Sequence, residues 1–174
     1  RLATMTSFRL LKKISAVKGR FIVRLLYIHP DHFNRDILPV MQKDGRIVPY
    51  FDIPFQSGDD EIIKAMNRKC TAKEYVRLVR DIRSSFPDAA IRTTFLTGFP
   101  GESDEAAQST ERFLSEIQCD WSGCFTYSRE EDTASYGMKG RVSQKSESVR
   151  LKRYRAKSPK SVSNCGAEKN TMCS

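Results

Sequence analysis

Polar or glycine-containing segments recur at four points of the chain, each directly after a predicted strand. These segments are residues 29–32 (HPDH), 56–59 (QSGD), 98–102 (GFPGE) and 127–130 (YSRE). In folds built from parallel strands, ligands bind at the carboxyl ends of the strands, where the following loops meet. We therefore expect these four segments to surround one binding site.

The third segment is the most informative of the four. Gly98 and Gly101 flank Phe99 and Pro100, so the backbone can approach a ligand closely, just ahead of a predicted helix N-terminus. Glu102 adds a carboxylate that can accept a hydrogen bond from a ligand amine or hydroxyl. A tight strand-to-helix turn, with glycines present for their backbone angles, explains the same residues equally well.

Two further side chains suit ligand binding. Gln56 follows a strand with few polar residues, and its neutral amide can hydrogen-bond a ribose hydroxyl or an amino-acid ligand without desolvation of a charge. A helix cap in the same turn explains Gln56 equally well. Arg92 lies inside a predicted strand, where a guanidinium needs a carboxylate from a ligand or from the protein. An ion pair with Asp52 is the structural alternative, and the residues alone favour it slightly.

The histidines and cysteines do not predict a metal or nucleophilic site. His29 and His32 are the only histidines and lack a third nitrogen ligand nearby, so we expect no zinc site. The spacing of Cys119 and Cys124 is typical of neither a thioredoxin-like motif nor a zinc knuckle, which favours buried structural thiols. Five cysteines, an odd number spread over 174 residues, argue against a disulfide scaffold.

Four apolar segments rich in β-branched and aromatic residues predict the strands. They are residues 21–29, 48–56, 90–97 and 121–128. Stretches of helical period separate them, which is typical of βαβ units and a parallel sheet. Four such units in series predict an α/β fold, either part of a β/α barrel or an open doubly wound sheet.

Helix-start signals place helices between the strands. Thr71 and Glu74 have the spacing of a capping box, in which each side chain satisfies a free backbone N–H. Ser103, followed by Asp104 and Glu105, marks a second start, because acidic side chains favour the positive end of the helix dipole. Further helices are predicted at residues 4–17, 35–43 and 59–68.

The net charge of +9 is unevenly distributed. Residues 1–138 hold 20 basic and 19 acidic side chains, whereas residues 139–174 hold 10 basic and two acidic ones. Because residues 143–174 are also poor in large apolar side chains, we predict that they are disordered. Such a tail can contact RNA through the phosphates, although a solvated charge run is the commoner role. The sequence has no apolar run of membrane-spanning length and no signal-peptide pattern, so we expect a cytoplasmic protein without membrane contacts.

Four consecutive segments match motifs of one known family. They are residues 24–33, 49–68, 82–102 and 120–133. Together they resemble the radical S-adenosylmethionine methylthiotransferases, and the resemblance spans residues 5–142. It is closest to the RimO type, which thiomethylates an aspartate of small-subunit ribosomal protein S-twelve. The sister MiaB type modifies a transfer-RNA adenosine.

The resemblance implies a partial parallel β/α barrel of six strands, of which residues 1–142 hold about four βα units. It also implies that S-adenosylmethionine lies across the carboxyl ends of the strands. The cofactor-binding residues that it implies are Gln56, Arg92, Gly98, Phe99, Pro100, Gly101, Glu102 and Tyr127.

The family's redox centre is a 4Fe-4S cluster held by a Cys-x-x-x-Cys-x-x-Cys loop. This sequence contains no such triplet, so we expect neither a metal ligand nor a catalytic residue in the chain. Family members continue into a small β-barrel called TRAM, whose alternating pattern residues 143–174 lack, which indicates truncation or a shifted reading frame. A first strand exposed at the sheet edge also predicts marginal stability for the chain alone.

The resemblance therefore predicts a fragment of a RimO-type methylthiotransferase that is inactive by itself. Its expected partner is a small-subunit ribosomal protein or the ribosome. The alternatives are a MiaB-type transfer-RNA methylthiotransferase and a non-catalytic remnant that binds RNA or the ribosome.

Overall fold

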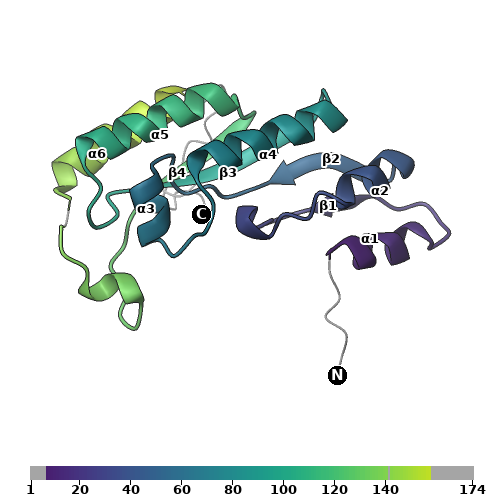
Figure 1. Cartoon of the computed structure of the whole chain (residues 1–174), viewed down its shortest axis with the longest axis horizontal. Coiled ribbons are helices and arrows are strands. Elements are labelled where there is room, and N and C mark those ends of the chain that lie inside the picture. Colours follow the sequence, from purple (N-terminus) through teal and green to yellow (C-terminus); the bar gives the residue numbers. More distant parts are fainter. Residues whose placement is uncertain (1–6, 141, 158–174) are drawn as a thin grey trace, which may run out of the picture.

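The computed structural model describes residues 7–140 and 142–157. Its sheet consists of four parallel strands: β1 (Val23–Leu25), β2 (Ile47–Asp52), β3 (Ala90–Thr97) and β4 (Trp121–Thr126). The helices that cover the sheet are the short α2 (Ile37–Lys43) and the longer α4 (Ala72–Ser85), α5 (Asp104–Ile117) and α6 (Gln144–Lys157), and α1 (Ser7–Ser15) packs against α2 (Figure 1). The loops contain α3 (Asp60–Ala65) and two 3-10 turns, η1 (Pro30–His32) and η2 (Ala134–Gly137).

The order of the strands decides between the two folds that the sequence left open. Each strand pairs with the next one along the chain, in the order β1-β2-β3-β4. Helices α4, α5 and α6 gather on one side of this sheet (Figure 1). A doubly wound sheet reverses its strand order and carries helices on both faces. Consecutive order with helices on one face is instead the arrangement of a β/α barrel segment.

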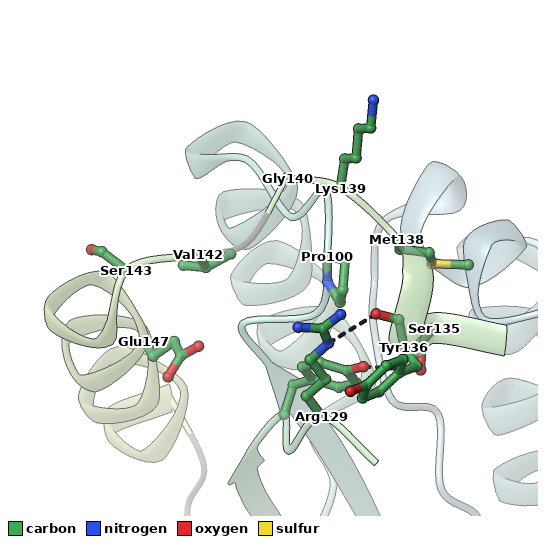
Figure 2. Close-up of a pocket in the computed structure, with 11 residues that line it drawn as sticks. Pro100, Arg129, Ser135, Tyr136, Met138, Lys139, Gly140, Val142, Ser143 and Glu147 are labelled. Carbon is green, nitrogen blue, oxygen red and sulfur yellow. Dashed lines mark hydrogen bonds between the residues drawn. The ribbon is translucent and has the colours of Figure 1, made fainter. Parts of the chain in front are cut away.

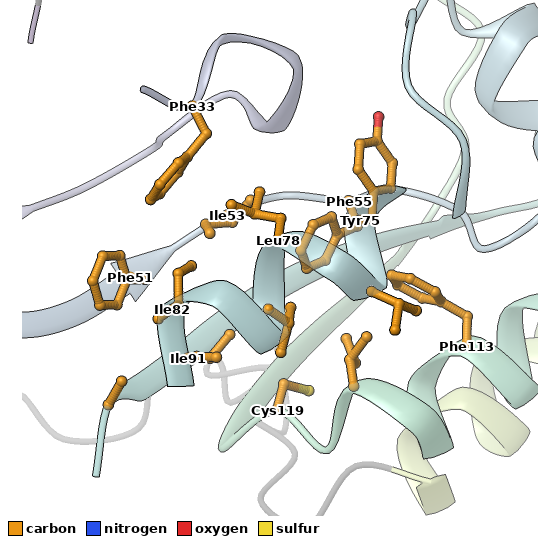
Figure 3. Packing of buried hydrophobic residues seen from close by; sticks show 14 of the residues in the cluster. Phe33, Phe51, Ile53, Phe55, Tyr75, Leu78, Ile82, Ile91, Phe113 and Cys119 are labelled. Atoms are coloured by element: carbon orange, nitrogen blue, oxygen red, sulfur yellow. The ribbon is translucent and has the colours of Figure 1, made fainter. Parts of the chain in front are cut away.

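The hydrophobic core fills the space between the sheet and these helices (Figure 3). Phe55, which follows β2, is fully buried, and its ring centroid lies 5.0 Å from that of Tyr75 on α4 and 5.4 Å from that of Phe113 on α5. Ile91 and Phe95 of β3 point into the same core. Because side chains alternate along a strand, residues 92, 94 and 96 face the other side of the sheet, where they are only partly buried.

Both predicted helix-start signals are confirmed. The Thr71 N–H donates to the Glu74 carboxylate at 2.7 Å, and the Glu74 N–H donates to the Thr71 hydroxyl at 3.3 Å, which completes a capping box. The Ser103 hydroxyl accepts from the Ala106 N–H at 3.2 Å at the start of α5. These local hydrogen bonds fix where α4 and α5 begin.

Three strands are shorter than predicted, of which β4 loses only its last two residues and ends at Thr126. β1 occupies three of the nine expected residues, its pairing with β2 is irregular, and Tyr27 adopts a left-handed φ of 55° that interrupts it. β1 has a neighbour on one side only among the described residues, so little holds its ends in register. β2 ends at Asp52, because Pro54 has no N–H to donate and Gln56 has a left-handed φ of 71°.

The prediction of disorder from residue 143 onward is wrong for residues 144–157. These residues form α6, which contacts α5 and β4. Arg150 and Tyr154 are buried in that contact, with 5% and 1% of their surface exposed. The basic composition of this segment did not predict a docked helix, because the buried side chains of α6 make polar contacts as well as apolar ones. The rest of the predicted tail lies outside the described residues.

No helix within the described ranges is long and apolar enough to cross a membrane.

Candidate functional site

The structure brings the loop after β3 and the segment after β4 together at the carboxyl end of the sheet. The Tyr127 N–H donates to the Thr97 carbonyl at 2.8 Å, so the two chain segments leave the sheet side by side. The Tyr127 ring then packs edge-on against Phe99, with ring centroids 5.4 Å apart. Two parts of the predicted binding set, the glycine loop and Tyr127, therefore share one location.

The glycines of this loop are required by its backbone shape. Gly98 and Gly101 have φ angles of +81° and +89°, which side chains rarely tolerate. The Gly98 N–H donates to the Glu102 carboxylate at 2.6 Å, and the Gly101 N–H donates to the Gly140 carbonyl at 2.9 Å. The turn interpretation of these glycines is thus correct, and their contact with a ligand stays a prediction.

The Glu102 carboxylate points into the fold and is saturated by protein donors. Its Oε2 accepts from the Gly98 N–H and from Arg150 Nη1 at 2.9 Å, and its Oε1 accepts from the Tyr154 hydroxyl at 2.9 Å. Only 2% of the side chain is exposed. This geometry gives Glu102 a structural role, fixing the start of the loop.

The charge state of this cluster follows from its contacts. Burial lowers the pKa of the Arg150 guanidinium, but hydrogen bonds and the charges of Asp104 and Glu102 outweigh burial and raise it above its ordinary value. Burial and the negative charge of Glu102 raise the pKa of the Tyr154 phenol. Arg150 therefore stays charged and Tyr154 stays protonated, as each must be to donate to Glu102.

Phe99 and Pro100 face different surroundings although they are adjacent. Phe99 is buried beneath the loop, where it packs with Ile62 of α3 and Ala106 of α5. Pro100 instead lines a cavity. Phe99 therefore anchors the loop to the core, and Pro100 is the part of this dipeptide that a ligand in the cavity would meet.

A cavity of about 710 Å³ lies between the glycine loop and the segment after β4 (Figure 2). The Arg129 guanidinium stacks over the Tyr136 ring at 4.0 Å, and its Nε donates to the Tyr136 carbonyl at 2.8 Å. On the same wall, the Tyr127 hydroxyl donates to the Ser135 hydroxyl oxygen at 3.0 Å. The remaining lining residues are Met138, Lys139, Gly140, Val142, Ser143 and Glu147. The cavity combines a cationic and aromatic wall with hydroxyl groups, which suits a polar ligand.

Gln56 lies at the end of the neighbouring strand in an unusual conformation. Its φ of 71° is left-handed, and its backbone is held by β3 through its N–H to the Thr94 carbonyl at 2.8 Å and its carbonyl to the Leu96 N–H at 2.9 Å. The helix-cap interpretation does not apply, because Asp59 caps α3. Within the described parts of the chain, the Gln56 side-chain amide has no hydrogen-bond partner. Strained backbone conformations cluster at functional sites, so Gln56 stays a candidate ligand contact.

Arg92 is not brought to this edge. Five residues separate it from Thr97 along β3, which at ~3.3 Å per residue is roughly 17 Å. Its Nη1 pairs with the Asp52 carboxylate at 2.8 Å. The structural alternative expected for Arg92 therefore accounts for its charge.

The two histidines lie close together, and Cys119 and Cys124 are buried as the sequence predicted. The His29 and His32 rings lie 5.0 Å apart, and among the described residues no group of three His, Cys, Asp or Glu side chains is arranged to hold a metal ion. Cys119 and Cys124 are buried, and burial raises the pKa of the Cys119 thiol to about 11. The described residues therefore do not fit an iron-sulfur cluster.

The residues that sequence reasoning missed are those of α6. Residues 147, 150, 151 and 154 follow the i, i+3, i+4, i+7 spacing of one helix face, and this face contacts α5 and the glycine loop. The spacing was a usable signal. We did not recognise this spacing, because two of the four residues are charged and the flanking positions are basic.

Residues 5–114 match the radical SAM superfamily. The chain belongs to this superfamily. Among curated proteins, this radical SAM chain is 56% identical over 149 residues to the ribosomal protein uS12 methylthiotransferase RimO of Treponema denticola, covering 82% of the chain and 32% of the relative. It is 40% identical over 133 residues to the protein of that name from Thermotoga maritima, covering 76% and 31%. The chain thus spans about a third of the length of the curated relatives it matches.

Solved structures support the fold of this radical SAM chain. Coproporphyrinogen III oxidase (HemN) from Escherichia coli aligns with a TM-score of 0.65 and 16% identity, covering 78% of this chain and 31% of that one. The archaeal Elp3 of Methanocaldococcus infernus aligns with a TM-score of 0.58 and 15% identity, covering 86% and 39%. The predicted fold class, a partial parallel β/α barrel, is confirmed.

Proposed function

We propose that this chain is a segment of a radical S-adenosylmethionine methylthiotransferase of the RimO type, acting on an aspartate of a small-subunit ribosomal protein in the cytoplasm. The observation that carries the proposal is the 56% identity to the Treponema denticola RimO protein. Eight curated relatives share the name ribosomal protein uS12 methylthiotransferase RimO, which favours a ribosomal protein over a transfer RNA as substrate.

In this proposal, S-adenosylmethionine lies along the carboxyl ends of β2, β3 and β4. The free amide of Gln56 supports it, because a neutral amide can bind a ribose hydroxyl or the amino-acid part of the ligand. The cavity beside Pro100 and Tyr127 supports it as well, since it opens at the same edge. When bound, the cofactor supplies the adenosyl and methyl groups that the chemistry uses.

The residues of this chain have binding and positioning roles. Gln56 holds a polar group of the ligand, and the loop from Gly98 to Glu102 shapes the adjacent wall. Tyr127 keeps that wall in place through its contacts with Phe99 and Ser135. Because the described residues do not fit an iron-sulfur cluster, we derive no redox step for them.

A chimera tests this function. The segment that matches in the Treponema denticola RimO protein is replaced by residues 5–157 of this chain, and the product is expressed in cells that lack their own enzyme. Mass spectrometry then measures the methylthio group on the target aspartate of uS12. We expect modification of uS12, and a lower level of it in a matched chimera with Gln56→Ala.

Two other results would contradict the proposal. Modified adenosine in the transfer RNA, with unmodified uS12, would assign the segment to the MiaB type. A folded chimera that modifies neither substrate would favour the binding-remnant alternative. For that alternative, RNA contact through the basic tail predicts steep salt dependence of RNA binding that disappears when residues 143–174 are deleted.

A further inference from the structure

Helix α6 contacts the glycine loop through three side chains on one face. Arg150 Nη1 donates to both the carbonyl and the carboxylate of Glu102 at 2.9 Å, and Tyr154 donates to the other carboxylate oxygen. Glu147, one turn earlier, lies so close to the loop that a β-carbon at Gly98 would be 2.6 Å from its Cγ. The loop therefore has a second support besides β3 and α5, and this support lies 45 or more residues further along the chain.

The ion pairs of Arg150 fix the position in which α6 docks. Arg150 is an ion-pair partner of Glu102 in the interior and of Asp104 at the surface, the latter at 2.8 Å. A buried guanidinium is costly unless carboxylates surround it, so α6 can dock in this position only when Glu102 and Asp104 are in place. Glu102 in turn accepts the Gly98 N–H at 2.6 Å. The docking of α6 and the conformation of the loop are thus linked through one carboxylate.

We propose that Arg150 and Tyr154 are positioning residues, through which α6 holds the Gly98–Glu102 loop in the conformation that binds the adenosyl ligand. The idea that the loop binds this ligand rests on the proposed function above. The link between α6 and the loop does not, since it concerns the protein without ligand. In this arrangement the buried Glu102 carboxylate holds the loop from its protein side. The backbone of residues 98–101 forms the surface that contacts the ligand.

The chain offers a matched control for this proposal. Arg153 lies on the same helix, one turn from Arg150, and pairs with Glu111 of α5 at 2.6 Å. Arg150→Gln removes the pair with Glu102 and the pair with Asp104, and Arg153→Gln removes the pair with Glu111. Only the first pair reaches the glycine loop.

Hydrogen exchange of the full chain, without ligand, measures the loop directly. We expect Arg150→Gln to speed exchange of the amides of residues 98, 99, 101 and 102 by about tenfold or more, while Arg153→Gln leaves them at the wild-type rate. Tyr154→Phe removes one hydroxyl and should give a smaller change in the same direction. This variant replaces Arg150→Gln in the test if Arg150→Gln does not fold. Equal exchange in the Arg150 and Arg153 variants, or no change in Tyr154→Phe, would overturn the proposal.

Titration with S-adenosylhomocysteine completes the test at a temperature where every variant is folded. We expect Arg150→Gln to weaken binding several-fold and Arg153→Gln to leave it unchanged. If the wild-type chain does not bind the compound, the proposed cofactor site fails, while the exchange experiment still decides the role of α6. If the wild type binds and Arg150→Gln binds equally well, the positioning role fails instead.

Discussion

Arg150 and Glu102 form an ion pair of 2.9 Å across 48 residues of sequence, and less than a tenth of either side chain is exposed. The pair joins the last described helix to the loop after β3. Exposed ion pairs of this protein, such as Arg80 with Glu116 at 2.8 Å, have a similar length but remain largely in water. Burial makes the two pairs energetically different, because an unpaired charge in the interior cannot recover its hydration.

The first prediction concerns the loss of this buried charge. Glu102→Gln keeps the shape of the side chain but leaves Arg150 without its interior carboxylate, so we expect the free energy of unfolding to fall by about 3 kcal/mol. Urea unfolding followed by circular dichroism measures the change. Glu116→Gln is the control and should cost less than about 1 kcal/mol, since its pair is exposed. Equal losses in both variants would show that α6 is not docked through Glu102.

A second prediction tests the contact between α5 and the turn after β2. A β-carbon at Gly58 would lie 2.9 Å from Thr110 Cα and closer still to Phe113, and neither neighbour can move without disturbing the core. We expect Gly58→Ala to destabilise the chain by about 1–3 kcal/mol. Gly45→Ala is the control, because nothing lies within 4 Å of its β-carbon. Thermal melting compares the two, and similar melting temperatures would mean that the turn packs differently.

Some elements of the fold were predictable from local sequence alone. The start of α4 follows from Thr71 and Glu74, whose capping bonds depend on residues three apart, and β3 occupies the predicted residues 90–97. β1 was predicted too long, because its alternating apolar residues do not reveal that it is paired on one side only among the described strands. Local pattern therefore predicts an element well when its stabilising contacts are also local.

In the candidate site too, features with local signals were predictable and those that depend on long-range contacts were not. The glycine loop and Tyr127 were found because glycine content and strand ends can be read directly from the sequence. The role of Arg150 was not found, because it depends on carboxylates 46 and 48 residues away. The pairing of Arg92 with Asp52, by contrast, was named from the sequence, because both residues lie in predicted strands, and the register of β2 and β3 makes them neighbours. Charges on elements that the sequence does not predict, such as α6, leave no such signal.

A third prediction concerns the stability of the protein at acidic pH. The Asp44 carboxylate accepts from Arg46 Nε at 2.8 Å and Nη2 at 2.7 Å, and from the Ser15 hydroxyl at 2.7 Å. These hydrogen bonds, those of Arg46 first, hold the pKa of Asp44 far below its ordinary value of 3.8. A depressed pKa in the folded state stabilises the protein above the unfolded pKa, and this contribution is lost as the pH falls below it.

The measurement compares the wild type with Asp44→Asn across the pH range. We expect the wild type to be more stable near neutral pH, and the difference to shrink progressively below about pH 4. Urea unfolding at each pH gives the two stability curves. A difference that is constant down to the strongly acidic range would mean that Asp44 has an ordinary pKa in the folded protein.

The last prediction separates the two unusual features of Gln56, its left-handed backbone and a side-chain amide that has no hydrogen-bond partner among the described residues. Gln56→Gly removes the amide and suits a φ of 71°, whereas Gln56→Ala removes the amide and keeps the backbone strain. If the amide binds the ligand, both variants should bind S-adenosylhomocysteine about 5- to 10-fold more weakly, the loss expected for one neutral hydrogen bond. Stability should instead distinguish them, with Gln56→Gly at least as stable as Gln56→Ala because only the glycine relieves the strain.

Calorimetric titration and urea unfolding of the same preparations give both quantities. Gln56→Glu is the informative third variant, since it keeps the length of the side chain and its acceptor oxygen but replaces the donor NH2 with a second oxygen. Retained affinity in Gln56→Glu would show that the residue accepts a hydrogen bond from the ligand, and lost affinity that it donates one. Unchanged affinity in all three variants would remove Gln56 from the site and leave its backbone conformation as a feature of the β2 to α3 turn alone.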